Sequence, residues 1–118
     1  MTLKLNHKNL EVWKKSMILV KEIYILCKSL PESEKFNLSS QMKRAAVSVV
    51  SNIAEGYARN SKIETKRFLD ISRSSLVELD TQLDLCIELE ILSAEDIKHV
   101  SDTLEHTFAM LSNLIKTL

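Results

Sequence analysis

The feature that most constrains the fold is a shortage of turn-forming residues. The 118-residue chain contains one glycine, Gly56, and one proline, Pro31. All-β domains need a turn about every 8–12 residues, and glycine and proline serve most of these turns. Charged residues make up 27% of the chain and hydrophobic residues 45%, which is too apolar for a disordered segment and too charged for a membrane protein. We therefore expect a single all-α domain.

Apolar residues recur at steps of three and four in four segments, which predicts four helices. The expected helices span residues 9–29, 39–56, 62–90 and 94–117. Pro31 ends the first helix, because its ring cannot continue the helical hydrogen bonds. Long helices joined by short connections predict an antiparallel up-down-up-down four-helix bundle that occupies residues 1–118.

Capping residues fix where these helices begin and end. We expect Ser39 and Ser93 to be N-caps, and Ser61 to form a capping box with Glu64. Gly56 is expected to end the second helix in the left-handed conformation. The expected core face of the first helix is wide: it is centred on Leu10, Trp13, Met17, Val20, Tyr24 and Cys27 and flanked by Leu19, Ile23, Leu26 and Leu30.

The second helix carries small residues that allow close packing and also a polar stripe. The stripe contains Gln41, Arg44, Ser48, Asn52 and Glu55, with Glu78 and Gln82 of the third helix as partners. It could form a ligand or catalytic pocket, or a polar network or wet subunit contact that fixes helix register. We favour the structural alternative, because no nucleophile–base pair accompanies the stripe.

The formal net charge is zero, but the charge is unevenly distributed along the chain. Residues 1–37 hold seven basic and four acidic side chains, and residues 38–75 hold seven and three. Residues 76–118 hold two basic and nine acidic side chains. This asymmetry predicts partners that are recognised by charge.

Two unlike stripes are expected to form a contact between subunits. The first helix presents Lys14, Ile18, Lys21, Ile25 and Lys28, and the third presents Val77, Asp80, Asp84, Ile87 and Ile91. A contact between unlike faces is heterologous and can close into a ring. The alternative is that both stripes are ordinary solvated faces with scattered apolar residues.

A basic run at the start of the third helix predicts nucleic-acid binding, since clustered Lys and Arg bind phosphate backbones. The candidate residues are Lys43, Arg59, Lys62, Lys66, Arg67 and Arg73. Alone, such a run can also be a solvated face with salt bridges along the helix. A ring would repeat the patch and strengthen binding through avidity.

Signatures of other functions are weak, so we expect a non-enzymatic, cytoplasmic protein without cofactor, metal or membrane span. Cys27 and Cys86 lie among apolar residues and are expected to be core thiols in a reducing compartment. Glu95, His99, Asp102 and His106 share one stripe of the fourth helix, which we interpret as a solvated face and not a metal site. The N-terminus has no signal-peptide pattern.

The sequence resembles the four-helix proteins encoded by 23S rRNA intervening sequences, which are often called ribosomal-protein-like. The residues that carry this resemblance are Gln41, Arg44, Ala45, Ala46, Ser48, residues 52–56, Leu76, Glu78, Leu79 and residues 81–83. The family usually has glycine where this chain has Asn37 and Ser74, and often proline at the position of Val50.

The resemblance implies an antiparallel bundle that assembles as a homopentamer. It also implies kinship with the accessory variability proteins of diversity-generating retroelements, which are basic pentameric rings that bind nucleic acid and a reverse transcriptase. We therefore expect a ring-forming bundle that binds RNA or DNA. The resemblance adds Arg44 to the candidate nucleic-acid-binding residues. A protein-interaction scaffold that does not bind nucleic acid is the alternative.

Overall fold

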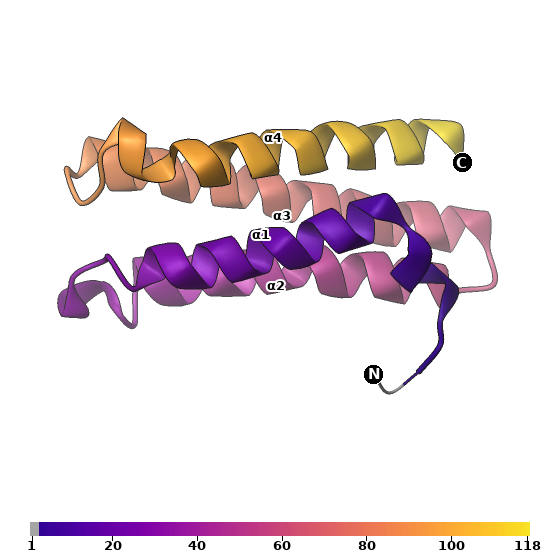
Figure 1. Cartoon of the computed structure of the whole chain (residues 1–118). Coiled ribbons are helices and arrows are strands. Elements are labelled where there is room, and N and C mark those ends of the chain that lie inside the picture. Colours follow the sequence, from indigo (N-terminus) through magenta and orange to yellow (C-terminus); the bar gives the residue numbers. More distant parts are fainter. Residues whose placement is uncertain (1–2) are drawn as a thin grey trace.

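The computed structural model describes residues 3–118, and the helices in it confirm the all-α prediction. The elements are η1 (Asn6–Asn9), α1 (Glu11–Cys27), η2 (Glu32–Glu34), α2 (Leu38–Tyr57), α3 (Lys62–Glu88) and α4 (Ala94–Thr117). Successive α-helices run in opposite directions along a bundle with principal extents of 44 × 30 × 20 Å (Figure 1). The fold is the predicted up-down-up-down four-helix bundle.

The four helices pack in the order α1, α2, α3, α4 around a shared core. Each helix contacts its two neighbours, and no Cα atom of α1 lies within 8 Å of a Cα atom of α3. Fully buried leucine and isoleucine side chains fill the centre of the bundle, among them Leu19, Ile23, Ile53 and Leu76. The helices are therefore held mainly by burial of their inward apolar stripes.

The contact between α2 and α3 depends on a small residue and on side-chain hydroxyls. Gly56 lies inside α2 with an ordinary helical backbone, which corrects the expected left-handed terminus. A Cβ atom on Gly56 would lie 3.1 Å from the Phe68 Cβ and from the Thr65 carbonyl oxygen. The Thr65 hydroxyl donates to the Gly56 carbonyl at 2.8 Å, and the Ser72 hydroxyl donates to the Val49 carbonyl at 2.7 Å. The glycine is needed for close helix approach and not for a turn.

The buried face of α1 is rotated from the predicted one. Its buried residues are Val12, Ser16, Leu19, Ile23 and Cys27. Met17 and Tyr24, both assigned to the core from the sequence, are 47% and 43% exposed. Apolar residues surround so much of this helix that periodicity alone could not select the inward stripe.

The bounds of α1 and α2 and the end of α3 differ from the predicted ones by one or two residues, whereas the start of α3 and both bounds of α4 agree. α1 begins at Glu11, after Leu10 in an extended conformation. It ends at Cys27, four residues before the proline that was expected to terminate it. α2 begins at Leu38, so Ser39 is a buried residue of its first turn and not its N-cap.

The caps of α3 and α4 differ in completeness. Ser61 accepts a hydrogen bond from the Glu64 amide at 3.4 Å, but the reciprocal bond of a capping box is not formed. Ser93 and Asp96 form both bonds of a capping box, at 3.2 and 2.9 Å. α4 therefore has the better-defined start.

The turn between α3 and α4 is a Schellman motif without glycine. α3 ends at Glu88, and Glu90 follows with a φ angle of 58°. The Ile91 amide donates to the Cys86 carbonyl at 2.8 Å, and the Glu90 amide donates to the Ile87 carbonyl at 2.9 Å. These two bonds define the motif, whose left-handed position usually holds glycine.

Candidate nucleic-acid interface

The basic run predicted from the sequence forms an exposed flank at the start of α3. We define the α3 flank as Lys62, Lys66 and Arg67, all of which are exposed. Within residues 3–118 none of the three forms a salt bridge. Lys66 and Arg67 border a shallow hollow of about 460 Å³ that also includes the exposed side chains of Ile63 and Ile71. The flank therefore offers three cations to an external anion.

Two neighbouring arginines are held by contacts within the chain. The Arg59 guanidinium lies 4.7 Å from the centre of the Phe68 ring and 3.2 Å from a Glu55 carboxylate oxygen. Arg73 pairs with Asp70 at 3.2 Å and donates to the Ser112 hydroxyl at 3.3 Å. Their charges are partly compensated, so they contribute less free cationic surface than the α3 flank.

The remaining predicted cations, Lys43 and Arg44, lie elsewhere on the bundle. The Met42 sulfur is 3.9 Å from the Cys86 sulfur, which places this turn of α2 beside the end of α3 and not its start. The Lys43 ammonium lies 5.0 Å from the centre of the Tyr24 ring on α1. Arg44 is exposed. The fold thus does not join these two residues to the α3 flank.

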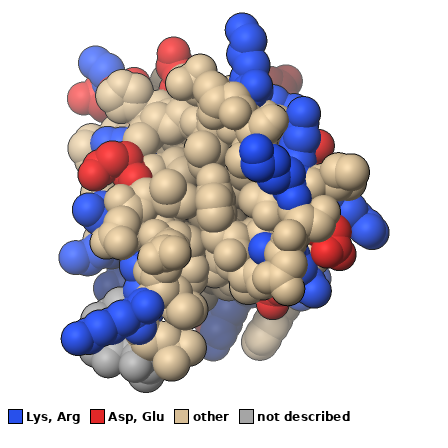
Figure 2. Space-filling view, turned by 90° about the vertical axis from the view of Figure 1, so that its right-hand side faces the viewer, with Lys and Arg blue, Asp and Glu red and all other residues tan. Residues whose placement is uncertain are grey.

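The fold instead gathers cations that are far apart in the sequence. The start of α1, the end of α2, the start of α3 and the end of α4 all meet at one end of the bundle (Figure 1). We call this the basic end and define it by its cations before α1, after α2, at the start of α3 and at the end of α4: Lys4, Lys8, Arg59, Lys62 and Lys116. Glu11, Glu55 and Glu64 lie at the same helix ends, so cations outnumber carboxylates there by five to three. Viewed along the bundle, Lys and Arg side chains project around its rim with Asp and Glu side chains between them (Figure 2). Separation in sequence hid Lys4, Lys8 and Lys116 from motif analysis.

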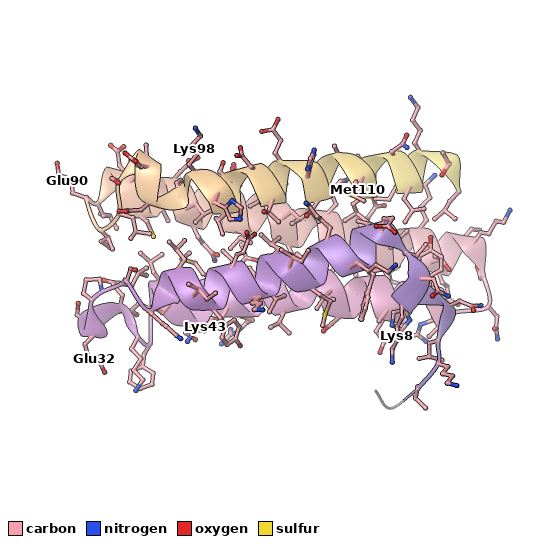
Figure 3. All side chains as sticks on the ribbon, in the orientation of Figure 1. Lys8, Glu32, Lys43, Glu90, Lys98 and Met110 are labelled. Atoms are coloured by element: carbon pink, nitrogen blue, oxygen red, sulfur yellow. The ribbon has the colours of Figure 1, made fainter. Side chains whose placement is uncertain are left out.

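The opposite end of the bundle has the opposite charge. η2 supplies Glu32 and Glu34, and the region around the α3–α4 turn supplies Glu88, Glu90, Glu95 and Asp96. Glu32 and Glu90 both lie at this end, on opposite sides of the bundle, and we call it the acidic end (Figure 3). A chain with zero net charge is therefore polarised along its 44 Å axis.

The two stripes predicted to join subunits are largely free on this chain. Lys14, Ile18, Lys21, Ile25 and Lys28 are all exposed on α1. On α3, Val77, Asp80 and Asp84 are exposed, whereas Ile87 is half-buried against the core. Ile91 is also half-buried and lies in the turn beyond α3, which corrects its placement on that helix.

Only part of the predicted polar stripe forms a network. The Ser48 and Ser75 hydroxyls are 2.8 Å apart, and the Asn52 amide donates to the Ser48 hydroxyl at 3.0 Å. Gln82 is 4% exposed and reaches Glu78 at 3.5 Å. The outer members of the stripe, Gln41, Arg44 and Glu55, are exposed. Sequence spacing did not reveal Ser75, which joins the two helices.

The histidines and cysteines take structural positions. His99 contacts Glu22 of α1, with Nε2 2.6 Å from a carboxylate oxygen, and this pair links α1 to α4. No group of three metal-ligating side chains occurs within residues 3–118. Burial raises the pKa of both the Cys27 and the Cys86 thiol. These thiols lie on α1 and α3, whose Cα atoms are more than 8 Å apart, too far for a disulfide.

Within residues 3–118, none of the helices has the length and apolar character needed to cross a bilayer.

Comparisons with known proteins agree with the fold and the motifs. A solved structure from Bacteroides thetaiotaomicron, of a protein with unknown function from the S23 ribosomal protein family, superposes with a TM-score of 0.82. That protein is 26% identical, and the match covers 89% of this chain and 98% of that one. No curated protein matches the chain. The profile of the 23S rRNA-intervening sequence protein family matches residues 8–113, and the chain therefore belongs to this family.

Proposed function

We propose that this protein binds nucleic acid, with RNA as the first candidate, through the α3 flank and the basic end. The observation that carries the proposal is the set of three exposed cations of the α3 flank, none of which has a carboxylate partner within residues 3–118. Lys and Arg side chains that form no salt bridge can displace the counterions of a phosphate backbone. The release of these counterions drives binding that is independent of base sequence. The family description names an rRNA element, which supports RNA as the partner class.

The proposal includes assembly of several copies through unlike faces. The exposed α1 stripe alternates lysine with isoleucine, and the exposed part of the α3 stripe combines Val77 with Asp80 and Asp84. Ile18 and Ile25 are 48% and 56% exposed on a single chain. A partner that covers them would remove apolar surface from water and pair opposite charges. A closed ring, with five copies as the resemblance implies, would repeat the basic surface in each subunit and raise the affinity for nucleic acid through avidity.

Binding, and not catalysis, is the proposed mode of action, in the cytoplasm and without a cofactor or metal. Ser48, Asn52 and Ser75 are hydrogen-bonded to one another between α2 and α3. The raised pKa values of Cys27 and Cys86 keep both thiols protonated. These groups are committed to the fold, which supports a surface-mediated function.

Salt dependence tests nucleic-acid binding directly. Affinity for a fluorescently labelled structured RNA should fall by orders of magnitude between about 50 and 200 mM salt if several phosphates are contacted. The triple variant Lys62→Gln, Lys66→Gln, Arg67→Gln should lose at least about tenfold at 100 mM salt. The control neutralises Lys35 and Lys98, which lie away from the basic end and outside the α1 stripe, and it should retain most of the affinity. If the wild type shows no salt-sensitive binding, the scaffold function is correct instead.

Light scattering tests the subunit contact. Ile18→Asp places a carboxylate in the middle of the α1 stripe, so it should lower the measured mass of the assembly while leaving the helical circular dichroism unchanged. Asp84→Lys should have the same effect from the other face. A wild-type protein that sediments as one subunit at micromolar concentration would refute the ring.

A further inference from the structure

The aromatic rings near the basic end are covered by other residues of the same chain. The Phe68 ring is covered by the Arg59 guanidinium at 4.7 Å. Trp13 packs against buried His7 in a T-shaped pair, with ring centres 5.3 Å apart. Tyr57 is half-buried against the core, and burial raises the pKa of its hydroxyl. The most exposed aromatic ring, Phe36 at 85%, lies in the α1–α2 connection at the acidic end.

Most of the lysines at the basic end, unlike the aromatic rings, are exposed. Lys4, Lys62 and Lys116 are exposed and lie before η1, on α3 and on α4, respectively. Lys8 is half-buried, and its ammonium donates to the Leu3 carbonyl. Lys and Arg side chains thus project around the end of the bundle, with Asp and Glu side chains between them (Figure 2). The rings of Trp13 and Tyr57 are half-buried, and that of Phe68 carries a cation. Such a surface can contact phosphates over a broad area but offers few ring faces to a base.

Exposed cations and exposed aromatic rings favour different kinds of nucleic acid. Proteins that bind single strands stack successive bases on aromatic rings, which contributes about 1–3 kcal/mol per base. A duplex keeps its bases stacked inside and presents phosphates on its outside, so it needs cations and no stacking rings.

We infer that the basic end docks against the phosphate backbone of a double-stranded nucleic acid, and that Lys4 and Lys116 belong to this docking surface. The inference rests on the proposed function, and it adds the strandedness of the ligand and two residues outside the predicted run. Recognition is independent of base sequence, because the contacts are made to phosphates.

The experiment compares two labelled probes of the same length in one buffer. One is an RNA duplex of about 20 base pairs, and the other is a single strand of the same length with little self-complementarity. The duplex should bind at least about tenfold more tightly, and a duplex of scrambled sequence should bind within about twofold of the first. Lys116→Gln should weaken duplex binding, whereas Lys98→Gln, an exposed lysine near the other end of the same helix, should not.

The outcomes separate this inference from the proposed function. If the single strand binds as tightly as the duplex or more tightly, the inference is wrong and nucleic-acid binding stands. If Lys62→Gln weakens duplex binding but Lys4→Gln and Lys116→Gln do not, the ligand lies along the α3 flank and the end surface is wrong. If neither probe binds, the proposed function fails and the inference fails with it.

Discussion

The two ends of this bundle differ in charge and in how the chain turns. At the basic end, α2 leads into α3 beside Gly56, whose lack of a side chain lets the two helices lie close together. At the acidic end, α3 leads into α4 through Glu90, which holds a left-handed backbone with a side chain that is ill suited to it. Glycine thus occurs at the close contact between α2 and α3, whereas the left-handed position in the α3–α4 turn holds glutamate.

The comparison shows that the zero net charge of the chain hides the charge separation on which the proposed function rests. Three of the five residues of the basic end, Lys4, Lys8 and Lys116, come from the two termini of the chain. The antiparallel fold brings both termini to the same end as the α2–α3 turn (Figure 1). On the proposed function, we expect a polyanion to approach the basic end and not the acidic end.

The largest expected effect on stability concerns the close contact at the basic end. Gly56→Val adds atoms where even a Cβ would lie 3.1 Å from Phe68 and Thr65. We expect this variant to be less stable by about 1–3 kcal/mol, because either α2 or α3 must shift. Ser51→Val, on the exposed side of the same helix, should change stability by less than about 0.5 kcal/mol. Urea denaturation checks both, and equal stability of the two variants would contradict the close-packing role.

The second effect compares the helix caps. Ser93→Ala should cost about 1 kcal/mol, because it removes the side-chain acceptor of a complete capping box. Ser61→Ala should cost less, since its bond to the Glu64 amide is long and unreciprocated. Thermal unfolding of both variants measures the difference, and a larger loss for Ser61→Ala would reverse the ranking of the two caps.

The cap of α4 also makes stability depend on pH. Hydrogen bonds from the Ser93 backbone and side chain hold the pKa of Asp96 below its ordinary value. The folded state therefore gains stability above the unfolded pKa of about 3.9, and this gain is lost as pH falls through the lower folded value. In Asp96→Asn, unfolding measured between pH 2 and pH 6 should show a weaker acid dependence than in the wild type. An unchanged acid dependence would contradict this role of Asp96.

The smallest expected effect is a gain at the acidic end. Glu90→Gly should stabilise the protein by about 0.5–1 kcal/mol, because glycine adopts a φ angle of 58° without the steric cost paid by other residues. Glu88→Gly, two residues earlier and at the last residue of α3, should instead destabilise by a similar amount. If both substitutions have the same sign in denaturant titrations, the Schellman turn has been assigned wrongly.

The sequence was sufficient to predict the fold because helix periodicity was strong and turn signals were few. The start of α3 after Ser61 and the bounds of α4 agree with the prediction, since each follows a serine cap. The inward stripe of α1 could not be predicted, because apolar residues cover most of that helix and packing selects among them. The role of Gly56 was also hidden, because close approach to Phe68 is a tertiary property.

The candidate site was predictable only where its residues are neighbours in the sequence. Lys62, Lys66 and Arg67 lie within two turns of one helix, so spacing alone places them together. Lys43 was grouped with them wrongly, because it lies on another helix beside Tyr24. Lys116 was missed because it is far from the run in sequence. Only the packed bundle brings the end of α4 to the same end as the start of α3 (Figure 1).

Footprinting of lysines by chemical acetylation tests the central claim most directly, because it can be applied to an assembly of any size. The protein is acetylated with and without RNA duplex, and the modification of each lysine is measured by mass spectrometry. We expect RNA to protect Lys62, Lys66 and Lys116, while Lys28, Lys35 and Lys98 react as in the free protein. Protection that is confined to these last three residues, or equal at both ends, would contradict the account.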